Sequence, residues 1–192
     1  MSQPIRLPGP VPGPALQPQS PRLRRSSLAV VAAVAAGTAL LGLAAGFVWA
    51  AVAPRAVLMM TSHGAAGLIN VETGAYFGAD VAFCLICLAG GVVSGALGYL
   101  LAVRRHGAVA MAGVLAGALA AAFVARWTGE QSGLAAFHHL LATLPPGARL
   151  RDALMLRATP ALAAWPLAAG LTAGAIELAA TRSRQPSLPP LD

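Results

Sequence analysis

Four long stretches of the chain are almost wholly apolar, and polar or proline-containing segments separate them. They cover about residues 28–53, 79–103, 107–125 and 158–180. About 20 apolar residues are enough for a helix to cross the ~30 Å hydrocarbon layer of a bilayer. The pattern therefore predicts an all-α membrane protein, a four-helix transmembrane bundle formed by a membrane domain at residues 27–181.

The two longest segments between the spans, residues 54–78 and 126–157, are predicted to form a small cap on the outer side. In the first, the β-prone pieces Val57–Met60 and Leu68–Glu72 alternate with turn residues, which predicts a short β-hairpin. In the second, Arg149–Arg157 alternates in part and is a candidate third strand. Whether the cap is α or β stays open, because apolar residues at helical spacing precede that strand and predict an amphipathic helix at the membrane interface: Leu134, Phe137, Leu140, Leu141 and Leu144.

Both ends of the chain are rich in proline and lack apolar periodicity. We expect residues 1–26 and 182–192 to be disordered tails. Arg24 and Arg25 precede the first apolar stretch, as in a secretory signal, but an apolar signal core is normally about 7–15 residues long. The first stretch is therefore interpreted as an uncleaved anchor.

The composition excludes an ordinary soluble domain. Of the 192 residues, 57% are hydrophobic and only 10% are charged, and the net charge of +7 comes from arginine alone. The arginines gather at the ends of the apolar runs. Their expected partner is therefore a bilayer with anionic headgroups, not nucleic acid.

The arginines also predict an orientation. Seven flank the proposed inner ends and three lie close to the outer ends, which by the positive-inside rule puts both termini in the cytoplasm of a plasma-membrane protein. The inner seven are Arg22, Arg24, Arg25, Arg104, Arg105, Arg182 and Arg184, and the outer three are Arg55, Arg126 and Arg157. Trp49, Trp127 and Trp165 fall near the outer ends, as expected of an interfacial aromatic belt.

Each predicted span contains two glycines four residues apart. Small residues let helix backbones approach closely in lipid, so these glycines predict tight packing within the bundle, self-association, or contact with another membrane protein. The pairs are Gly42 and Gly46, Gly91 and Gly95, Gly113 and Gly117, and Gly170 and Gly174. Pro160 lies at the start of the fourth span, and Pro166 inside it is predicted to kink the helix.

Asp80 is the sharpest candidate for chemistry, because an ionisable group at membrane depth is costly. It lies at the level of Arg126 and Arg157. We expect a structural ion pair there, with a proton or ion site as the alternative. Glu177, near the inner end, is expected to reach the interface or to pair with Arg104 or Arg182.

The remaining candidates are weaker. Cys84 and Cys87 share a helix face, as in bundles that exchange disulfides with quinones, but no second cysteine pair exists, and packing is the favoured interpretation. The spacing of His63, His138 and His139 matches no zinc motif. We therefore expect no catalytic residues, no metal and no cofactor.

Several short motifs resemble an actinobacterial family of four-span integral membrane proteins of unknown function. They are Phe77-Gly78-Ala79-Asp80, Trp127-Thr128-Gly129, Leu156-Arg157-Ala158 and Ala164-Trp165-Pro166-Leu167-Ala168-Ala169, and the likeness covers roughly residues 45–180. The resemblance implies the four-span topology and supplies no activity. The cysteine pair is not part of the family's pattern.

The sequence thus predicts a non-enzymatic accessory protein or scaffold for cell-envelope proteins. A small oligomeric transporter or proton-coupled permease that uses Asp80, Arg126 and the Pro166 kink is the alternative, since so few spans would need an oligomer. A membrane thiol–disulfide oxidoreductase that uses Cys84 and Cys87 is the third hypothesis.

Overall fold

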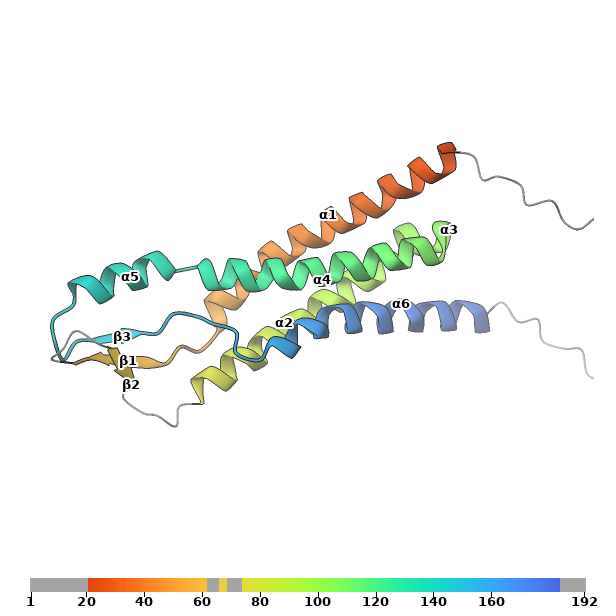
Figure 1. The fold of residues 1–192 in the computed structure, drawn as a ribbon. Helices are drawn as coiled ribbons and strands as arrows, with labels where there is room; N and C mark the ends of the chain where they lie inside the picture. Colours follow the sequence, from red (N-terminus) through yellow and green to blue (C-terminus); the bar gives the residue numbers. More distant parts are fainter. Residues whose placement is uncertain (1–20, 62–65, 69–73, 184–192) are drawn as a thin grey trace, which may run out of the picture.

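The computed structural model describes residues 21–61, 66–68 and 74–183 of the chain. Within these residues it has four long helices and a small sheet at one end of the bundle (Figure 1). The predicted fold class is confirmed. His63, Arg184, most of the piece Leu68–Glu72 and most of both predicted tails lie outside the described residues.

Four helical segments among the described residues are long and apolar enough to cross a membrane, so the chain is a multi-pass membrane protein. They are α1 (Pro21–Val52), α2 (Ala75–Gly98) with its continuation through the π-helix η1 (Tyr99–Val103) and α3 (Arg104–His106), α4 (Ala108–Gln131), and α6 (Ala164–Arg182) preceded by the 3₁₀-helix η2 (Thr159–Ala163). α1 begins inside the predicted tail, and α4 continues past the predicted end of its span at Ala125.

Bilayer thickness explains why the fourth span has two parts. α6 has 19 residues and is therefore about 28 Å long, slightly less than the ~30 Å hydrocarbon layer. The five residues of η2 add about 10 Å. Pro160 lies in the first turn of η2, as predicted. Pro166 is the third residue of α6, a position where a backbone N–H would have no partner within the helix, so the missing N–H of proline breaks no helical hydrogen bond. In place of the predicted kink, the span changes from 3₁₀- to α-helix at Ala164.

The helices pack in two close pairs, α1 with α4 and α2 with α6. Glycines form the contact surfaces, because a side chain at these positions would collide with the partner backbone. A Cβ at Gly42 would lie 2.8 Å from Cα of Ala121 on α4, and a Cβ at Gly95 would lie 2.8 Å from Cα of Ala169 on α6. The close approach supplies the van der Waals contact that holds helices together in lipid.

Three of the four predicted glycine pairs lie in these contacts, and the fourth does not. Gly46, Gly91, Gly113 and Gly117 also face a neighbouring helix closely. A Cβ at Gly170 would touch Leu115 only at an ordinary 3.4 Å, and one at Gly174 would meet no atom within 4 Å. Gly170 and Gly174 therefore do not bring two helices of this bundle into close contact, and Gly174 lines a cavity. Self-association or contact with another protein through them stays a prediction.

The small sheet and a short helix form the cap at one end of the bundle, which we call the outer end; the opposite end is the inner end. The sheet order is β2 (Ala66–Leu68), β1 (Val57–Met60), β3 (Arg149–Arg151), all antiparallel. A hairpin with a third strand is present as predicted, but β2 shares only Leu68 with the predicted piece Leu68–Glu72, and β3 ends at Arg151, before the predicted Arg157. The described chain starts and finishes at the inner end (Figure 1).

Helix α5 (Leu134–Thr143) follows α4 and covers one face of the sheet (Figure 1). Phe137, Leu141 and Leu144 pack against the buried side chains Leu58, Met60 and Leu150. The amphipathic pattern predicted the helix correctly, and part of its apolar face meets the sheet. The cap consequently has a small hydrophobic core of its own. The location of α5 at the membrane interface stays a prediction.

Candidate functional site

The connector Asp152–Ala158, which leads from β3 back to the bundle, is the centre of the polar contacts at the outer end. Its Leu154 and Leu156 are buried in the main core, where they pack with residues of α1, α2 and α4. An extended segment placed there carries backbone N–H groups that need acceptors, since burying an unpaired amide is costly. Acidic side chains from α2 and α4 supply these acceptors.

Asp80 on α2 accepts two of these backbone hydrogen bonds. Its Oδ1 accepts from the N–H of Arg157 and its Oδ2 from the N–H of Ala158, each at 3.0 Å. The expected ion pair with the side chain of Arg126 or Arg157 is therefore wrong. Both carboxylate oxygens are engaged by the connector, which favours a structural role over a proton or ion site.

Glu130 on α4 holds the connector from the other side. Its Oε1 accepts a hydrogen bond from the N–H of Leu156 at 3.1 Å and pairs with the guanidinium Nε of Arg126 at 3.0 Å. Arg126 thus pairs one turn along its own helix and does not contact Asp80. The spacing of four residues between Arg126 and Glu130 is visible in the sequence, yet sequence reasoning missed the pair.

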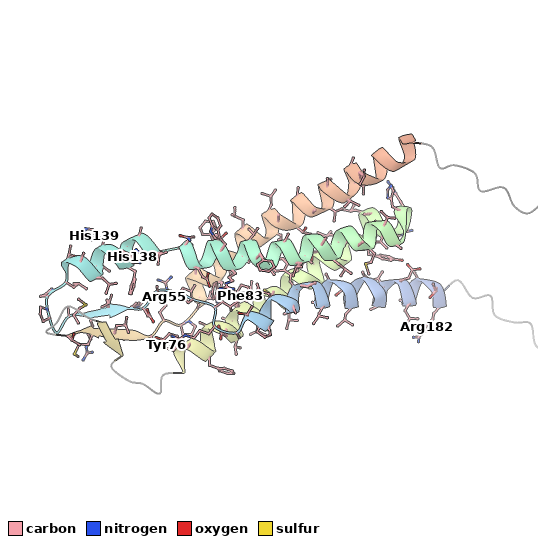
Figure 2. The ribbon with its side chains drawn as sticks, in the orientation of Figure 1. Arg55, Tyr76, Phe83, His138, His139 and Arg182 are labelled. Carbon is pink, nitrogen blue, oxygen red and sulfur yellow. The ribbon has the colours of Figure 1, made fainter. Side chains whose placement is uncertain are left out.

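Tyr76 and Asp152 form a third attachment. Tyr76 lies at the start of α2 (Figure 2). Its hydroxyl donates to Oδ2 of Asp152 at 2.7 Å. The guanidinium carbon of Arg157 lies over the Tyr76 ring, 3.6 Å from its centroid, in a cation–π contact. We call the three acids Asp80, Glu130 and Asp152 the connector clamp. Two of its members, Glu130 and Asp152, and also Tyr76, were not singled out from the sequence.

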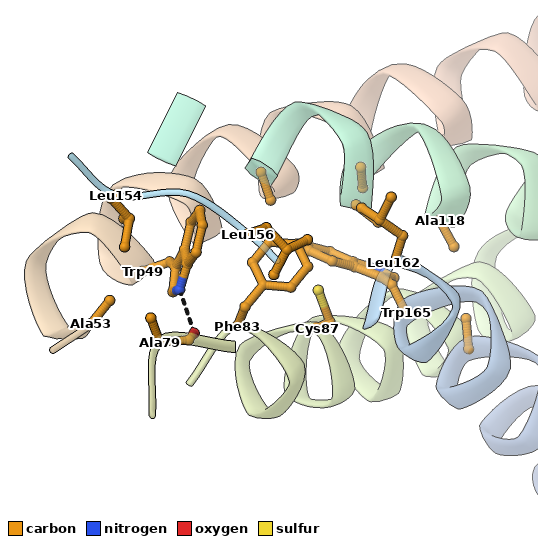
Figure 3. Close-up of a cluster of buried hydrophobic side chains, with 14 of the residues drawn as sticks. Trp49, Ala53, Ala79, Phe83, Cys87, Ala118, Leu154, Leu156, Leu162 and Trp165 are labelled. Carbon is orange, nitrogen blue, oxygen red and sulfur yellow. Dashed lines mark hydrogen bonds between the residues drawn. The ribbon is translucent and has the colours of Figure 1, made fainter. Parts of the chain in front are cut away.

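Two tryptophans predicted for an interfacial belt are core residues. Trp49 and Trp165 are fully buried, whereas Trp127 is 63% exposed. The indole N–H of Trp49 donates to the Ala79 carbonyl at 2.8 Å, and its ring meets Phe83 edge-on (Figure 3). Buried tryptophans need such a partner for the N–H.

Trp165 is anchored in the same way. Its indole N–H donates to Ser94 Oγ at 3.1 Å, and Ser94 itself donates to the Gly91 carbonyl. The rings of Trp49 and Trp165 fit because they lie against glycines, Gly129 and Gly90 respectively. The belt prediction is therefore wrong for Trp49 and Trp165, and it stays a prediction for the exposed Trp127.

The positions of the two cysteines fit the favoured interpretation that they are packing residues. Cys87 is fully buried in the main core, beside Phe83 and Trp165, and Cys84 is partly buried (Figure 3). Both are free thiols in the structure.

The histidines of α5, His138 and His139, are exposed on the cap surface (Figure 2). Among the described residues no group of three His, Cys, Asp or Glu side chains is placed to hold a metal ion.

Arg55 follows α1 at the outer end and donates to the Ala50 carbonyl at 3.1 Å, which satisfies one of the carbonyls left open at the end of a helix. At the inner end, Glu177 accepts a hydrogen bond from the Tyr99 hydroxyl at 2.6 Å. Its expected partners, Arg104 and Arg182, do not pair with it among the described contacts.

The face of the sheet turned away from α5 is exposed. Val57 and Met59 are 43% and 39% exposed there. The register places Arg151 opposite Val57 and Arg149 opposite Met59, and both arginines are exposed. We call these four residues the sheet face. It combines apolar contact area with two positive charges.

No protein-family model, no curated protein and no solved structure matches this chain. The resemblance to four-span actinobacterial proteins therefore stays a prediction, and the geometry carries the functional proposal.

Proposed function

We propose that this is a non-enzymatic accessory or scaffold protein of the plasma membrane, with both termini in the cytoplasm. Its cap would bind an acidic segment in the extracytoplasmic part of another envelope protein. The observation that carries the proposal is the exposed sheet face, with Val57 and Met59 next to Arg149 and Arg151.

The orientation rests on charge. The arginine pair at the α3–α4 turn and Arg182 lie at the inner end, as do the arginines that open α1. Counting Arg149 and Arg151 with the outer set changes the ratio from seven against three to seven against five. The positive-inside rule still favours cytoplasmic termini. The inner arginines are suited to anionic headgroups, at about 1 kcal/mol each near the surface.

The connector clamp supports the docking role. A surface that is already fixed before binding loses less entropy on association than a loose one. Strand β3, which carries the two arginines of the sheet face, leads directly into the connector. Because Asp80 and Glu130 hold the connector, they tie this strand of the sheet to the bundle. A partner would therefore meet the sheet face at a fixed orientation above the membrane.

Charge indicates which partner fits. An acidic segment would pair with Arg149 and Arg151, whereas a second copy using the same face would bring arginine against arginine. Like charges at an interface cost free energy and suppress the wrong partner. The geometry therefore favours a different protein over self-association through this face.

Site-specific photocrosslinking in intact cells tests the proposal. We place a photoreactive amino acid at Met59 on the sheet face, and at His138 on α5, which is also exposed, as the matched control. A discrete protein adduct from Met59 only, lost when Arg149 and Arg151 are both changed to glutamate, is expected. If Met59 gives no reproducible adduct, or if the charge-reversed variant gives the same adduct, the scaffold proposal is wrong.

The two other hypotheses draw less support from the geometry. The transporter mechanism needs Asp80 and Arg126, and both are engaged in holding the connector and its helix. An Asp80→Asn variant with unchanged flux would exclude that mechanism. The thiol–disulfide mechanism needs an accessible cysteine, and Cys87 is fully buried. Failure of Cys84 to react with a membrane-permeant thiol probe would exclude it.

A further inference from the structure

The inner end of the bundle contains a cavity of about 390 Å³ between η1, the α3–α4 turn and α6. This volume is within the range of about 300–1,000 Å³ that is usual for small-molecule sites. Its lining includes Tyr99, Arg104, Met111, Gly174 and Glu177. None of these residues takes part in the connector clamp or the sheet face, which lie at the other end of the molecule.

The cavity carries one group of each charge. The carboxylate of Glu177 is oriented by the Tyr99 hydroxyl, which donates to its Oε2 at 2.6 Å. Arg104 lines the same cavity, and within the described residues it forms no ion pair with Glu177 or with another carboxylate. The two charges therefore stand apart in the cavity lining and can each meet a different part of a ligand.

The backbone of this region departs from a regular α-helix at the place where the cavity forms. Residues Tyr99–Val103 form a π-helical segment, which accommodates an extra residue and so rotates the next turn by about 100° relative to a continuous α-helix. Arg104 comes directly after this segment and is the residue whose direction this changes. On the opposite wall, Gly174 leaves open space, since a Cβ there would meet no atom within 4 Å.

The depth of the cavity in the bilayer further restricts the class of ligand that it can bind. Arg104, Arg105 and His106 end the second span directly before Gly107, whose φ of +63° makes the turn. Arginines at the end of a span lie at the level of the lipid headgroups. The solute most concentrated at that level is a phospholipid headgroup.

We propose that this cavity binds a phosphoethanolamine group, with its phosphate at Arg104 and its ammonium at Glu177. A purely anionic group would be repelled by Glu177, and a purely cationic group by Arg104. A zwitterion satisfies both charges, and phosphate–arginine pairing is among the strong charge-assisted contacts. The group is the headgroup of phosphatidylethanolamine; free phosphoethanolamine offers the same chemistry from solution.

Native mass spectrometry of the full chain in mild detergent, with equal amounts of phosphatidylethanolamine and phosphatidylglycerol, tests the site. We expect wild type to retain phosphatidylethanolamine about two- to fivefold over phosphatidylglycerol, the range for one partly exposed ion pair. Glu177→Gln should reduce this ratio to near one, because it removes the contact that only the ammonium makes. Arg104→Gln removes the phosphate contact that both lipids share and should lower the retention of both. Gly174→Leu adds bulk to the cavity at a position where a Cβ would meet no atom within 4 Å, so it should lower the retention of both lipids without changing a charge.

Arg105→Gln is the matched control. It removes the same charge at the same helix end but does not line the cavity, so the lipid preference should persist. The proposal is overturned if wild type shows no preference, if Glu177→Gln keeps it, or if Arg105→Gln lowers the retention of both lipids as much as Arg104→Gln. Displacement of the bound lipid by excess free phosphoethanolamine supports recognition of the headgroup. Binding of the free compound without any lipid preference would overturn the lipid as its source.

Discussion

Replacing Asp80 by asparagine tests whether its carboxylate holds the connector backbone. The change keeps the shape of the side chain but turns one acceptor oxygen into an NH₂ group that faces an N–H donor. Asp80 accepts two backbone hydrogen bonds, from Arg157 and Ala158, each at 3.0 Å. Hydrogen bonds to charged groups are worth about 1.5–3 kcal/mol, and the site is partly solvated, so we expect a loss of about 1–3 kcal/mol in the free energy of unfolding.

The companion variant Arg157→Gln distinguishes hydrogen bonding of Asp80 to the connector backbone from an ion pair between the side chains of Asp80 and Arg157. It keeps the backbone N–H that Asp80 binds and removes only the cation–π contact with Tyr76, worth about 0.5–1 kcal/mol at an exposed site. Unfolding is followed by the fluorescence of the buried Trp49 and Trp165 during titration of the detergent-solubilised protein with dodecyl sulfate. Asp80→Asn should be the more destabilising change.

A double-mutant cycle of these two variants gives the decisive number. We expect a coupling energy below about 0.5 kcal/mol between the two side chains, as for residues without a direct interaction. An Arg157→Gln variant as unstable as Asp80→Asn, with a coupling energy above about 1 kcal/mol, would show that the side chains pair and would refute the reasoning.

Three further predictions use the same unfolding titration. Ser94→Ala should cost about 0.6–1.7 kcal/mol, and Trp165→Phe should cost more, because Trp165 is fully buried and the smaller ring also leaves a cavity. The double variant should cost little more than Trp165→Phe alone, because both changes remove the same hydrogen bond at 3.1 Å; additive losses would contradict this. Gly95→Ala should destabilise by about 1–3 kcal/mol while Gly174→Ala is neutral or slightly stabilising, and equal effects would contradict the assigned helix contacts. Thr128→Val should be neutral or stabilising by up to about 1 kcal/mol, since the buried Thr128 hydroxyl has no hydrogen-bond partner in the described structure; a loss above ~1 kcal/mol would show that it has one.

Hydrophobic pattern was sufficient to predict the spans, because a bilayer requires uninterrupted apolar helices of a certain length. The β-prone piece Val57–Met60 and the partial alternation that begins at Arg149 likewise predicted β1 and β3, whereas β2 (Ala66–Leu68) shares only Leu68 with its predicted piece. Helix ends were less predictable: α4 continues through Arg126 and Glu130, since an ion pair between them lets charged residues remain helical beyond the apolar run. The hydropathy pattern alone does not reveal that such an ion pair stabilises the helix end.

The hydrogen-bond partners of individual polar residues could not be predicted from the sequence, for a physical reason. Asp80 binds backbone N–H groups of a distant segment, and nearly every residue type offers the same N–H, so no residue pattern marks the partner. Trp49 and Trp165 resembled belt residues because their position along the chain is the same whether they face lipid or core. The signal that distinguishes the two is the facing glycine, Gly129 or Gly90, together with Ser94 as an acceptor.

The distance between the cap and the bundle is the measurement that tests the central claim most directly. Spin labels are placed at Met59 on the sheet face and at Leu171, which is 74% exposed on α6, in a background with Cys84 and Cys87 changed to alanine. Pulsed electron paramagnetic resonance then gives the distribution of distances between the labels. A clamped cap predicts one narrow distribution that broadens when Asp80 and Glu130 are both changed to alanine. A broad distribution in the parent, or an unchanged narrow one in the clamp variant, would contradict the account.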